Sequence, residues 1–263
     1  LLVDGLNTYI RSFMAIPSLN EDGLHTGGIS GFLKSIGYAI KLINPTRVIV
    51  VFDGNGGSQK RRKIYPEYKK GRKTRIKFNR TYEEMSDSDI EQKNLKMELL
   101  RLINYLDVLP ITVMAIDNIE ADDTIAYFSE LVTKNGGSSI IYSTDKDFLQ
   151  MVSDTVKLYN PVKKKTFDVD IVLETYGVHP SNFVFYRSLL GDKSDNIDGI
   201  KGAGEKTVLK YIPELADPNV EVNLDLVEQK YADIKKKPKL VENILDNSSI
   251  VNRNLELMNL FDL

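Results

Sequence analysis

Short apolar runs separated by longer amphipathic segments predict alternating strands and helices in the first 180 residues. Four runs have the length and composition of buried parallel strands, namely residues 1–3, 47–52, 138–142 and, less clearly, 111–116. The predicted helices are residues 28–43, 89–106, 121–134, 146–152 and 168–176. This order favours an α/β fold with a mostly parallel central sheet flanked by helices.

The pattern changes after residue 180, where only helices are predicted. They cover residues 181–190, 204–212, 224–232 and 238–246. We therefore expect an α/β core over residues 1–179 and a helical region over residues 180–263.

The composition restricts the possible metal ligands more than it restricts the class of protein. The chain has 263 residues, 42% hydrophobic and 27% charged, which is an ordinary globular balance. No apolar run approaches the roughly 18 residues of a membrane span, and no signal-peptide pattern opens the sequence, so we expect a cytoplasmic protein without membrane contact. Cysteine is absent and histidine occurs twice. Any metal site should therefore use oxygen ligands, which favours Mg²⁺ or Mn²⁺.

The net charge of −2 conceals a strongly basic segment. Residues 58–80 hold eleven Lys or Arg and one Glu, interleaved with Tyr65, Tyr68 and Phe78. From the charge run alone, a solvated loop and a functional segment are about equally favoured. Cations that follow phosphates, together with rings that stack on bases, are however typical of single-stranded nucleic acid binding.

Each clear predicted strand ends in an aspartate. These residues are Asp4, Asp53 and Asp145. An aspartate after a strand is often only a helix N-cap or turn former. Because ligands of open α/β sheets bind at the carboxyl ends of the strands, the three carboxylates should nevertheless converge.

Further acidic residues strengthen the case for one acidic site. They follow the other predicted strands or precede the glycine-rich turn, and they are Glu120, Asp122, Asp123, Asp147, Asp192 and Asp195. Two carboxylate charges ~5 Å apart repel by about 3 kcal/mol at an effective dielectric constant of ~20. Divalent cations remove this repulsion. A cluster made only of carboxylates fits a two-metal site for phosphodiester hydrolysis.

A glycine-rich turn lies between two predicted helices of the second region. It contains Gly199, Lys201, Gly202, Gly204 and Lys206. It does not match the Walker P-loop, because Glu205 precedes the lysine and no strand comes before the turn. A grip on a DNA phosphate through backbone N–H groups is favoured over a simple helix C-cap.

Motifs distributed along nearly the whole chain resemble the metal-dependent 5′-nucleases. This family includes flap endonucleases, the 5′-nuclease domain of bacterial DNA polymerase I, and stand-alone bacteriophage 5′-exonucleases and ribonuclease H. The motifs, in order, are Leu2-Val3-Asp4-Gly5-x-Asn7, Val51-Phe52-Asp53-Gly54, Pro66-Glu67-Tyr68-Lys69-x-x-Arg72, Glu120-Ala121-Asp122-Asp123, Ser143-Thr144-Asp145-x-Asp147, Gly191-Asp192-x-x-Asp195-Asn196, Gly199-Ile200-x-Gly202-x-Gly204-x-Lys206-Thr207 and Asn252-Arg253-Asn254-Leu255.

The resemblance implies roles for the acidic residues and for two basic ones. A first metal group would be Asp4, Asp53, Glu120, Asp122 and Asp123, and a second would be Asp145, Asp147, Asp192 and Asp195. Lys69 and Arg72 match basic residues that contact the scissile phosphate at the base of a helical arch. Two or more Mg²⁺ or Mn²⁺ ions are implied as cofactors.

The resemblance also implies a PIN-like nuclease core with two DNA-binding elements. These are the arch, residues 70–90, and a helix–three-turn–helix over residues 187–212, which can hold K⁺ in relatives. The residues expected to contact DNA are Arg61, Arg62, Tyr68, Lys69, Lys70, Arg72, Lys73, Gly199, Lys201, Gly202, Gly204, Lys206 and Thr207.

The resulting hypothesis is a stand-alone, monomeric, structure-selective 5′→3′ exonuclease and flap endonuclease. Its expected substrates are DNA with 5′ ends or flaps and RNA–DNA hybrids, with a sliding clamp or single-strand-binding protein as further partners. A catalytically silent branched-DNA binding module is the main alternative. Another α/β phosphohydrolase, based on Asp145 and Asp147, is a weaker one. The C-terminal stretch Leu255–Phe261 is expected to pack on the core, with a clamp-binding motif as the less favoured interpretation.

Overall fold

The computed structural model describes residues 1–71 and 88–261. Its strands are β1 (Leu2–Asp4), β2 (Ile49–Asp53), β3 (Thr112–Ile116), β4 (Ser139–Tyr142), β5 (Val156–Asn160), β6 (Lys165–Phe167), β7 (Gly191–Asp192) and β8 (Ile197–Asp198). Its α-helices are α1 (Gly5–Ala15), α2 (Gly27–Ile43), α3 (Gln59–Ile64), α4 (Ser88–Leu106), α5 (Ala121–Lys134), α6 (Val169–Tyr176), α7 (Phe183–Leu190), α8 (Glu205–Tyr211), α9 (Leu224–Lys230), α10 (Lys239–Asp246) and α11 (Ser248–Met258). Short 3₁₀ turns cover Asp147–Met151, Pro180–Asn182 and Pro213–Ala216.

Six strands form one twisted sheet in the order β3-β2-β1-β4-β5-β6. All neighbouring pairs are parallel except β5 and β6, which are antiparallel. Asp4 lies opposite Val51 on β2, and Asp53 lies opposite Ile116 on β3. The strand ends that carry these aspartates therefore reach the same edge of the sheet, and the predicted mostly parallel α/β sheet is confirmed.

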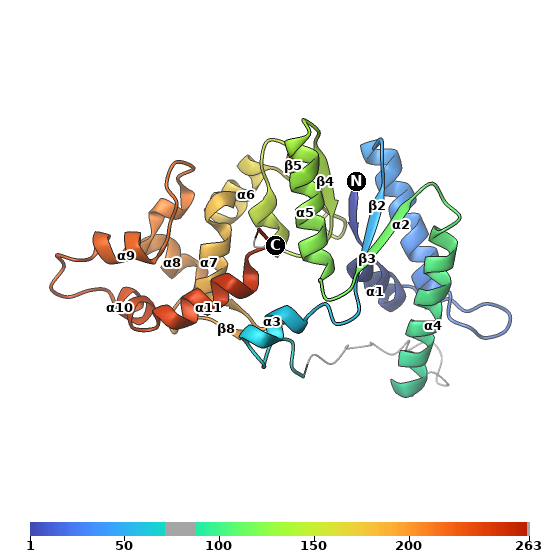
Figure 1. The fold of residues 1–263 in the computed structure, drawn as a ribbon, viewed down its shortest axis with the longest axis horizontal. Coiled ribbons are helices and arrows are strands. Elements are labelled where there is room, and N and C mark those ends of the chain that lie inside the picture. Colours follow the sequence, from blue (N-terminus) through green and yellow to red (C-terminus); the bar gives the residue numbers. More distant parts are fainter. Residues whose placement is uncertain (72–87, 262–263) are drawn as a thin grey trace.

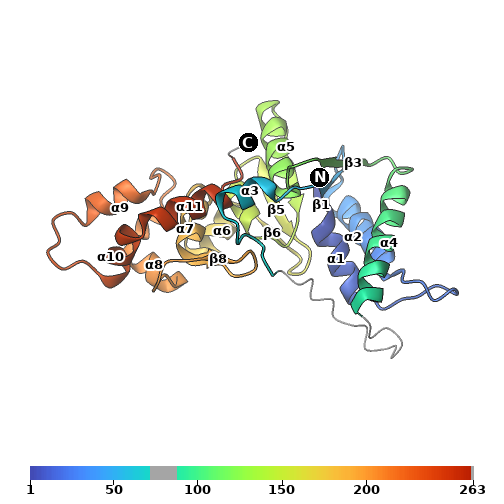
Figure 2. The same cartoon turned by 60° about the horizontal axis from the view of Figure 1, so that its bottom comes forward.

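Helices cover both faces of the sheet, as a parallel sheet requires. Alternate strand residues point to opposite faces, so Val51 packs with α5 while Val50 and Phe52 pack with α1, α2 and α4. Figure 2 shows α5 on one side of the strands and α1, α2 and α4 on the other. This arrangement leaves the carboxyl edge of the sheet open for a site.

Helices α7–α11 extend from one end of the molecule beside the β4–β5 half of the sheet (Figure 1). Their apolar residues belong to the same hydrophobic cluster as α5 and the strands, from Leu2 to Leu260. The buried amide of Asn254 on α11 donates to the backbone oxygens of Ser188 at 2.9 Å and Asp198 at 2.8 Å. The boundary predicted at residue 180 thus crosses a continuous core, and the division into residues 1–179 and 180–263 stays a prediction.

The structure corrects several predicted elements. The region after residue 180 is not purely helical, because β7 and β8 form a small antiparallel hairpin. Helix α1 was missed since it begins directly after β1, with Asp4 serving as both the last strand residue and the helix N-cap. Strands β5 and β6 and helices α3 and α11 were also missed, because they are short or follow another element almost without a break.

The C-terminal segment packs on the core, as expected. Leu257, Met258 and Leu260 are all buried. The side chain of Gln150 donates to the Met258 carbonyl oxygen and accepts from the Leu260 N–H. Across the described ranges, no helix has the length and apolar character needed to traverse a bilayer.

Candidate active site

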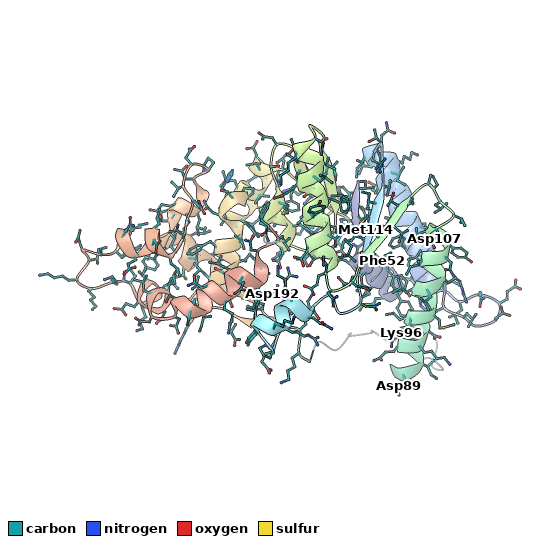
Figure 3. The ribbon with its side chains drawn as sticks, viewed as in Figure 1. Phe52, Asp89, Lys96, Asp107, Met114 and Asp192 are labelled. Carbon is teal, nitrogen blue, oxygen red and sulfur yellow. The ribbon has the colours of Figure 1, made fainter. Side chains whose placement is uncertain are left out.

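A cavity of about 500 Å³ lies at the carboxyl edge of the sheet, between α1, α5 and the β7–β8 hairpin. Six of the nine predicted carboxylates line it, together with the predicted phosphate-contacting lysine. These residues are Asp4, Asp53, Asp122, Asp145, Asp192, Asp195 and Lys69. Figure 3 labels Asp192 between the sheet and helices α7–α11, and Phe52 within the sheet. The convergence expected from the sequence is therefore present.

Asp4 is fixed at the centre of the sheet edge by neutral donors. Its carboxylate accepts the backbone N–H of Asn7 at 3.1 Å and the hydroxyl of Ser143 at 2.9 Å. Burial is the main cause that raises the pKa of Asp4 to about 6, and the nearby charges of Asp145 and Asp53 add to it. Asp4 thus has two hydrogen bonds but is still destabilised in its charged form.

The start of α5 brings Asp53 and Asp122 to the same cavity. The Asp53 carboxylate accepts the backbone N–H of Ala121, the first residue of α5, at 2.8 Å. Burial, followed by the charges of Asp145 and Asp4, raises the pKa of Asp122 well above its ordinary value. Mutual repulsion between these carboxylates is therefore a property of the cavity and not of one residue.

Glu120 and Asp123 turn away from the cavity and pair with buried Arg61. The guanidinium donates to the Glu120 carboxylate and makes two bonds of 2.7 Å to Asp123. Its Nε also donates to the Leu257 carbonyl oxygen at 2.8 Å. Arg61 is only 6% exposed and holds the start of α5 and the chain's C-terminal segment together. This burial does not favour the predicted DNA contact, which stays a prediction.

Tyr68 and Lys69 form a second support beneath the acidic residues. The Lys69 Nζ donates to Glu120 at 2.6 Å. The Tyr68 hydroxyl lies 3.1 Å from Glu120 and 3.3 Å from Asp195 and shares its single proton between these two acceptors. Tyr68 is 3% exposed, so its burial does not favour stacking on a base, and the predicted DNA contact stays a prediction. Burial opposes ionisation of Glu120, but Lys69 and Arg61 outweigh it and lower its pKa.

Arg187 on α7 joins two carboxylates on the opposite side of the cavity. Its Nε donates to Asp147 at 3.0 Å, and its Nη2 donates to Asp192. Burial and the charge of Asp145 still raise the pKa of Asp147 to about 7. The pKa of Asp192 is lowered despite burial, since Ser194 donates two hydrogen bonds of 2.7 Å and Arg187 adds its charge.

Sequence reasoning missed the role of Arg187. It lies forty residues from Asp147 and outside every motif, so only the packing of α7 reveals the contact. The hydroxyl of Ser143, by contrast, was visible as part of a motif, but nothing local indicated that it would donate to Asp4.

The remaining basic residues divide between the surface and the undescribed part of the chain. Arg62 and Lys70 are exposed, and Lys70 pairs with Glu67 at 2.7 Å. Arg72 and Lys73, and most of the predicted arch, lie outside the described residues. Their predicted roles stay predictions.

The glycine-rich turn connects β8 to α8 as a compact loop. Gly199 packs so closely on the Leu190 carbonyl that a Cβ would clash, and Gly202 has a φ of +87°. Lys201, Gly202, Gly204 and Lys206 are exposed, while Thr207 is half-buried. The loop therefore presents backbone and two lysines to solvent, as a phosphate grip requires.

The cavity fits divalent metal ions in its chemistry. Its side chains are hard oxygen donors, and the raised pKa values of Asp4 and Asp122 show that their negative charge is poorly compensated by the protein. Among the described residues, no group of three or more acidic or histidine side chains is already arranged around a single point. Mg²⁺ commonly uses one or two carboxylates and completes its shell with water and substrate oxygens.

Comparisons with known proteins agree with this site. The family model of the 5′-3′ exonuclease N-terminal, resolvase-like domain matches residues 1–177. A 5′-3′ exonuclease of Aquifex aeolicus is 33% identical over 238 residues, which cover 90% of this chain and 76% of the relative. The thermostable DNA polymerase I of Thermus thermophilus is also 33% identical, over 87% of this chain but only 25% of its own length.

Solved structures show the same fold at lower identity. The bacteriophage T5 D15 protein co-crystallised with metal ions has a TM-score of 0.75 at 23% identity, covering 98% of this chain and 88% of that one. The T5 flap endonuclease in a pseudo-enzyme–product complex with DNA and metal ions has a TM-score of 0.76 at 22% identity, with the same coverage.

The α/β fold and the acidic cavity at its sheet edge fit a nuclease, with this cavity as the candidate active site. The family model and the Aquifex relative identify the family within this class. The chain belongs to the 5′-3′ exonuclease family.

Proposed function

We propose that this nuclease is a structure-selective 5′→3′ exonuclease and flap endonuclease that uses two or more Mg²⁺ or Mn²⁺ ions. The observation that carries the proposal is the gathering of six carboxylates and Lys69 around one cavity. Lys69, which belongs to the basic segment of residues 58–80, lines this cavity, and this supports a polyanionic substrate. Relatives named as 5′-3′ exonucleases, and a fold neighbour solved with DNA and metal ions, point the same way.

The cavity carboxylates are the residues that would hold the metal ions. Asp4, Asp53 and Asp122 lie towards β1, β2 and α5, while Asp145, Asp192 and Asp195 lie towards β4 and the β7–β8 hairpin. Bound divalent ions would supply an activated water and compensate charge on the scissile phosphate. Glu120, Asp123 and Asp147 would support the site without holding a metal ion directly. Their carboxylates already pair with Arg61, Lys69 and Arg187.

Lys69 would exchange its partner Glu120 for a phosphate of the substrate. Its ammonium group lines the cavity and pairs with Glu120, and its side chain is 17% exposed. Its left-handed backbone, with φ of 54°, is tied by its N–H to the Asp195 carbonyl oxygen at 2.9 Å. A phosphate in the cavity would offer this cation a second anionic partner at little conformational cost.

Duplex DNA would lie across the exposed turn of residues 199–204. Lys201 and Lys206 would neutralise backbone phosphates, which confers affinity without sequence preference. Arg62 and Lys70, together with Arg72 and Lys73, would contact the strand nearer the cavity. A K⁺ ion at the turn, implied by the family resemblance, belongs to the same proposal.

Single-turnover cleavage of a 5′-flap DNA labelled at both ends tests the proposal. Cuts near the junction are expected with Mg²⁺ or Mn²⁺, and no product is expected with EDTA. Ca²⁺ serves to measure binding separately. Tight binding of the flap by folded protein, with no cleavage in any metal, would replace the proposal by the silent branched-DNA binding module.

A further inference from the structure

A second, smaller cavity of about 260 Å³ lies between α2 and the ends of β4 and β5. Three cationic side chains and three tyrosines line it, namely Arg11, Lys34, Lys164, Tyr38, Tyr142 and Tyr159. None of the described residues that line this pocket is acidic. It therefore differs sharply from the neighbouring active-site cavity, which six carboxylates line.

Arg11 on α1 connects the two cavities, because its side chain lines both. Its Nη1 is buried and has no hydrogen-bond partner among the described residues. Burial lowers the pKa of Arg11, although Tyr142 and the charge of Asp4 partly compensate. Buried polar atoms in folded proteins nearly always have a partner. An arginine nitrogen without one, at the wall of a basic pocket, points to an anionic ligand.

The tyrosines give the pocket a rigid wall with polar atoms. The rings of Tyr142 and Tyr159 are stacked, with centroids 5.6 Å apart. Burial raises the pKa of the Tyr142 hydroxyl, and Ser35 and Arg11 partly offset this, while burial and Tyr38 raise the pKa of Tyr159. Lys34 on α2 and Lys164 in the β5–β6 turn are exposed at its mouth. Hydroxyls on two buried, stacked rings, with flexible cations at the entrance, are suited to a phosphate group.

We propose that this pocket binds a second phosphate group of the nucleic-acid strand whose scissile phosphate occupies the acidic cavity. The inference rests on the proposed function only for the identity of the strand. The phosphate is either the terminal 5′-monophosphate or an internal phosphodiester, and both offer the same oxygen acceptors to Arg11 and the lysines. Arg11 would then link cleavage in one cavity to anchoring in the next.

Equilibrium binding in Ca²⁺ tests the pocket independently of cleavage. Fluorescence anisotropy would compare two DNAs of identical sequence, labelled at the 3′ end and carrying either a 5′-phosphate or a 5′-hydroxyl. The variant is Lys34→Ala, and the control is Lys41→Ala, an exposed lysine two turns further along α2 and outside the pocket. Lys164→Asn, which tolerates the left-handed backbone at that position, is matched with exposed Lys163→Ala.

We expect Lys34→Ala and Lys164→Asn to weaken binding about 3- to 10-fold more than their controls. A loss confined to the 5′-phosphorylated DNA identifies the terminal monophosphate as the ligand. An equal loss for both DNAs identifies an internal phosphodiester. Losses no larger than those of the control variants for either DNA overturn the proposal.

The failure of this proposal is distinguishable from failure of the proposed function. If wild-type protein binds DNA with the Lys34 dependence described but does not cut a 5′ flap, the pocket stands and the nuclease assignment falls. If wild-type protein cuts the flap while the pocket variants bind DNA like their controls, the nuclease assignment stands and the pocket proposal falls.

Discussion

The carboxylates of this site fall into two groups with opposite electrostatics. Asp4 and Asp122, in the cavity, have raised pKa values, because burial and neighbouring carboxylates outweigh their hydrogen bonds. Glu120, behind the cavity, has in contrast a lowered pKa, since Lys69 and Arg61 compensate it. Asp192 lines the cavity but also has a lowered pKa, because Ser194 donates to it and Arg187 adds its charge. The protein therefore compensates Glu120 and Asp192 itself and leaves Asp4 and Asp122 to be compensated from outside.

Asp147 combines features of both groups, because a protein cation binds it and its pKa is nevertheless raised. It bonds with Arg187 at 3.0 Å, yet burial and the charge of Asp145 raise its pKa to about 7. One cation shared with Asp192 is not enough for both carboxylates at this position. A divalent ion near Asp145 would relieve Asp147 as well, so the two groups are coupled through this corner of the site.

The largest expected effect separates a cavity carboxylate from a supporting one. Asp145→Asn should lower the single-turnover rate on the order of 10⁴-fold, since it removes a metal ligand, without loss of stability because it relieves repulsion. Asp123→Asn should lower both the rate and the free energy of unfolding, because it breaks the two bonds from Arg61. Flap cleavage and urea unfolding measure the two quantities. A wild-type rate in Asp145→Asn would refute its role as a ligand.

The next effect concerns the buried cation itself. Arg61→Met should lower the free energy of unfolding by about 4 kcal/mol, because Asp123 and Glu120 would stay buried with less compensation. Arg62→Met, at the adjacent exposed position, is the matched control and should change stability by less than about 0.5 kcal/mol. Equal effects in urea unfolding for the two variants would mean that Arg61 is not a structural cation.

The positions that sequence alone predicted well are those set by local pattern. Asp4 and Asp53 were found because a parallel strand ends where its apolar run ends, and such ends converge at one edge. Arg61 and Tyr68 were assigned to DNA because composition reveals charge and aromatic character but not burial. Arg187 was missed because its contact with Asp147 depends on how α7 packs, which no local signal records.

A smaller effect follows from the raised pKa of Asp4. When an acidic group has a higher pKa in the folded than in the unfolded protein, the protein loses stability as the pH rises between these two values. For Asp4 this range is from about 4 to about 6. Without divalent ions, Asp4→Asn should therefore gain stability relative to wild type over this range, by up to about 3 kcal/mol. Urea unfolding in EDTA at several pH values measures the difference. A stability difference that does not change with pH would show that Asp4 ionises normally.

The smallest effect isolates burial from pairing. Glu130 and Lys134 on α5 form an ion pair of 3.1 Å, longer than the 2.7 Å pair of Arg61 with Asp123, and the lysine side chain is 73% exposed. Lys134→Ala should change the free energy of unfolding by less than about 0.5 kcal/mol, because water compensates an exposed carboxylate. If this change approached that of Arg61→Met in the same urea experiment, ion pairing itself would account for the stability. If it stays small, what distinguishes the supporting carboxylates is that only a protein cation can reach them, whereas the cavity carboxylates remain open to ions from solution.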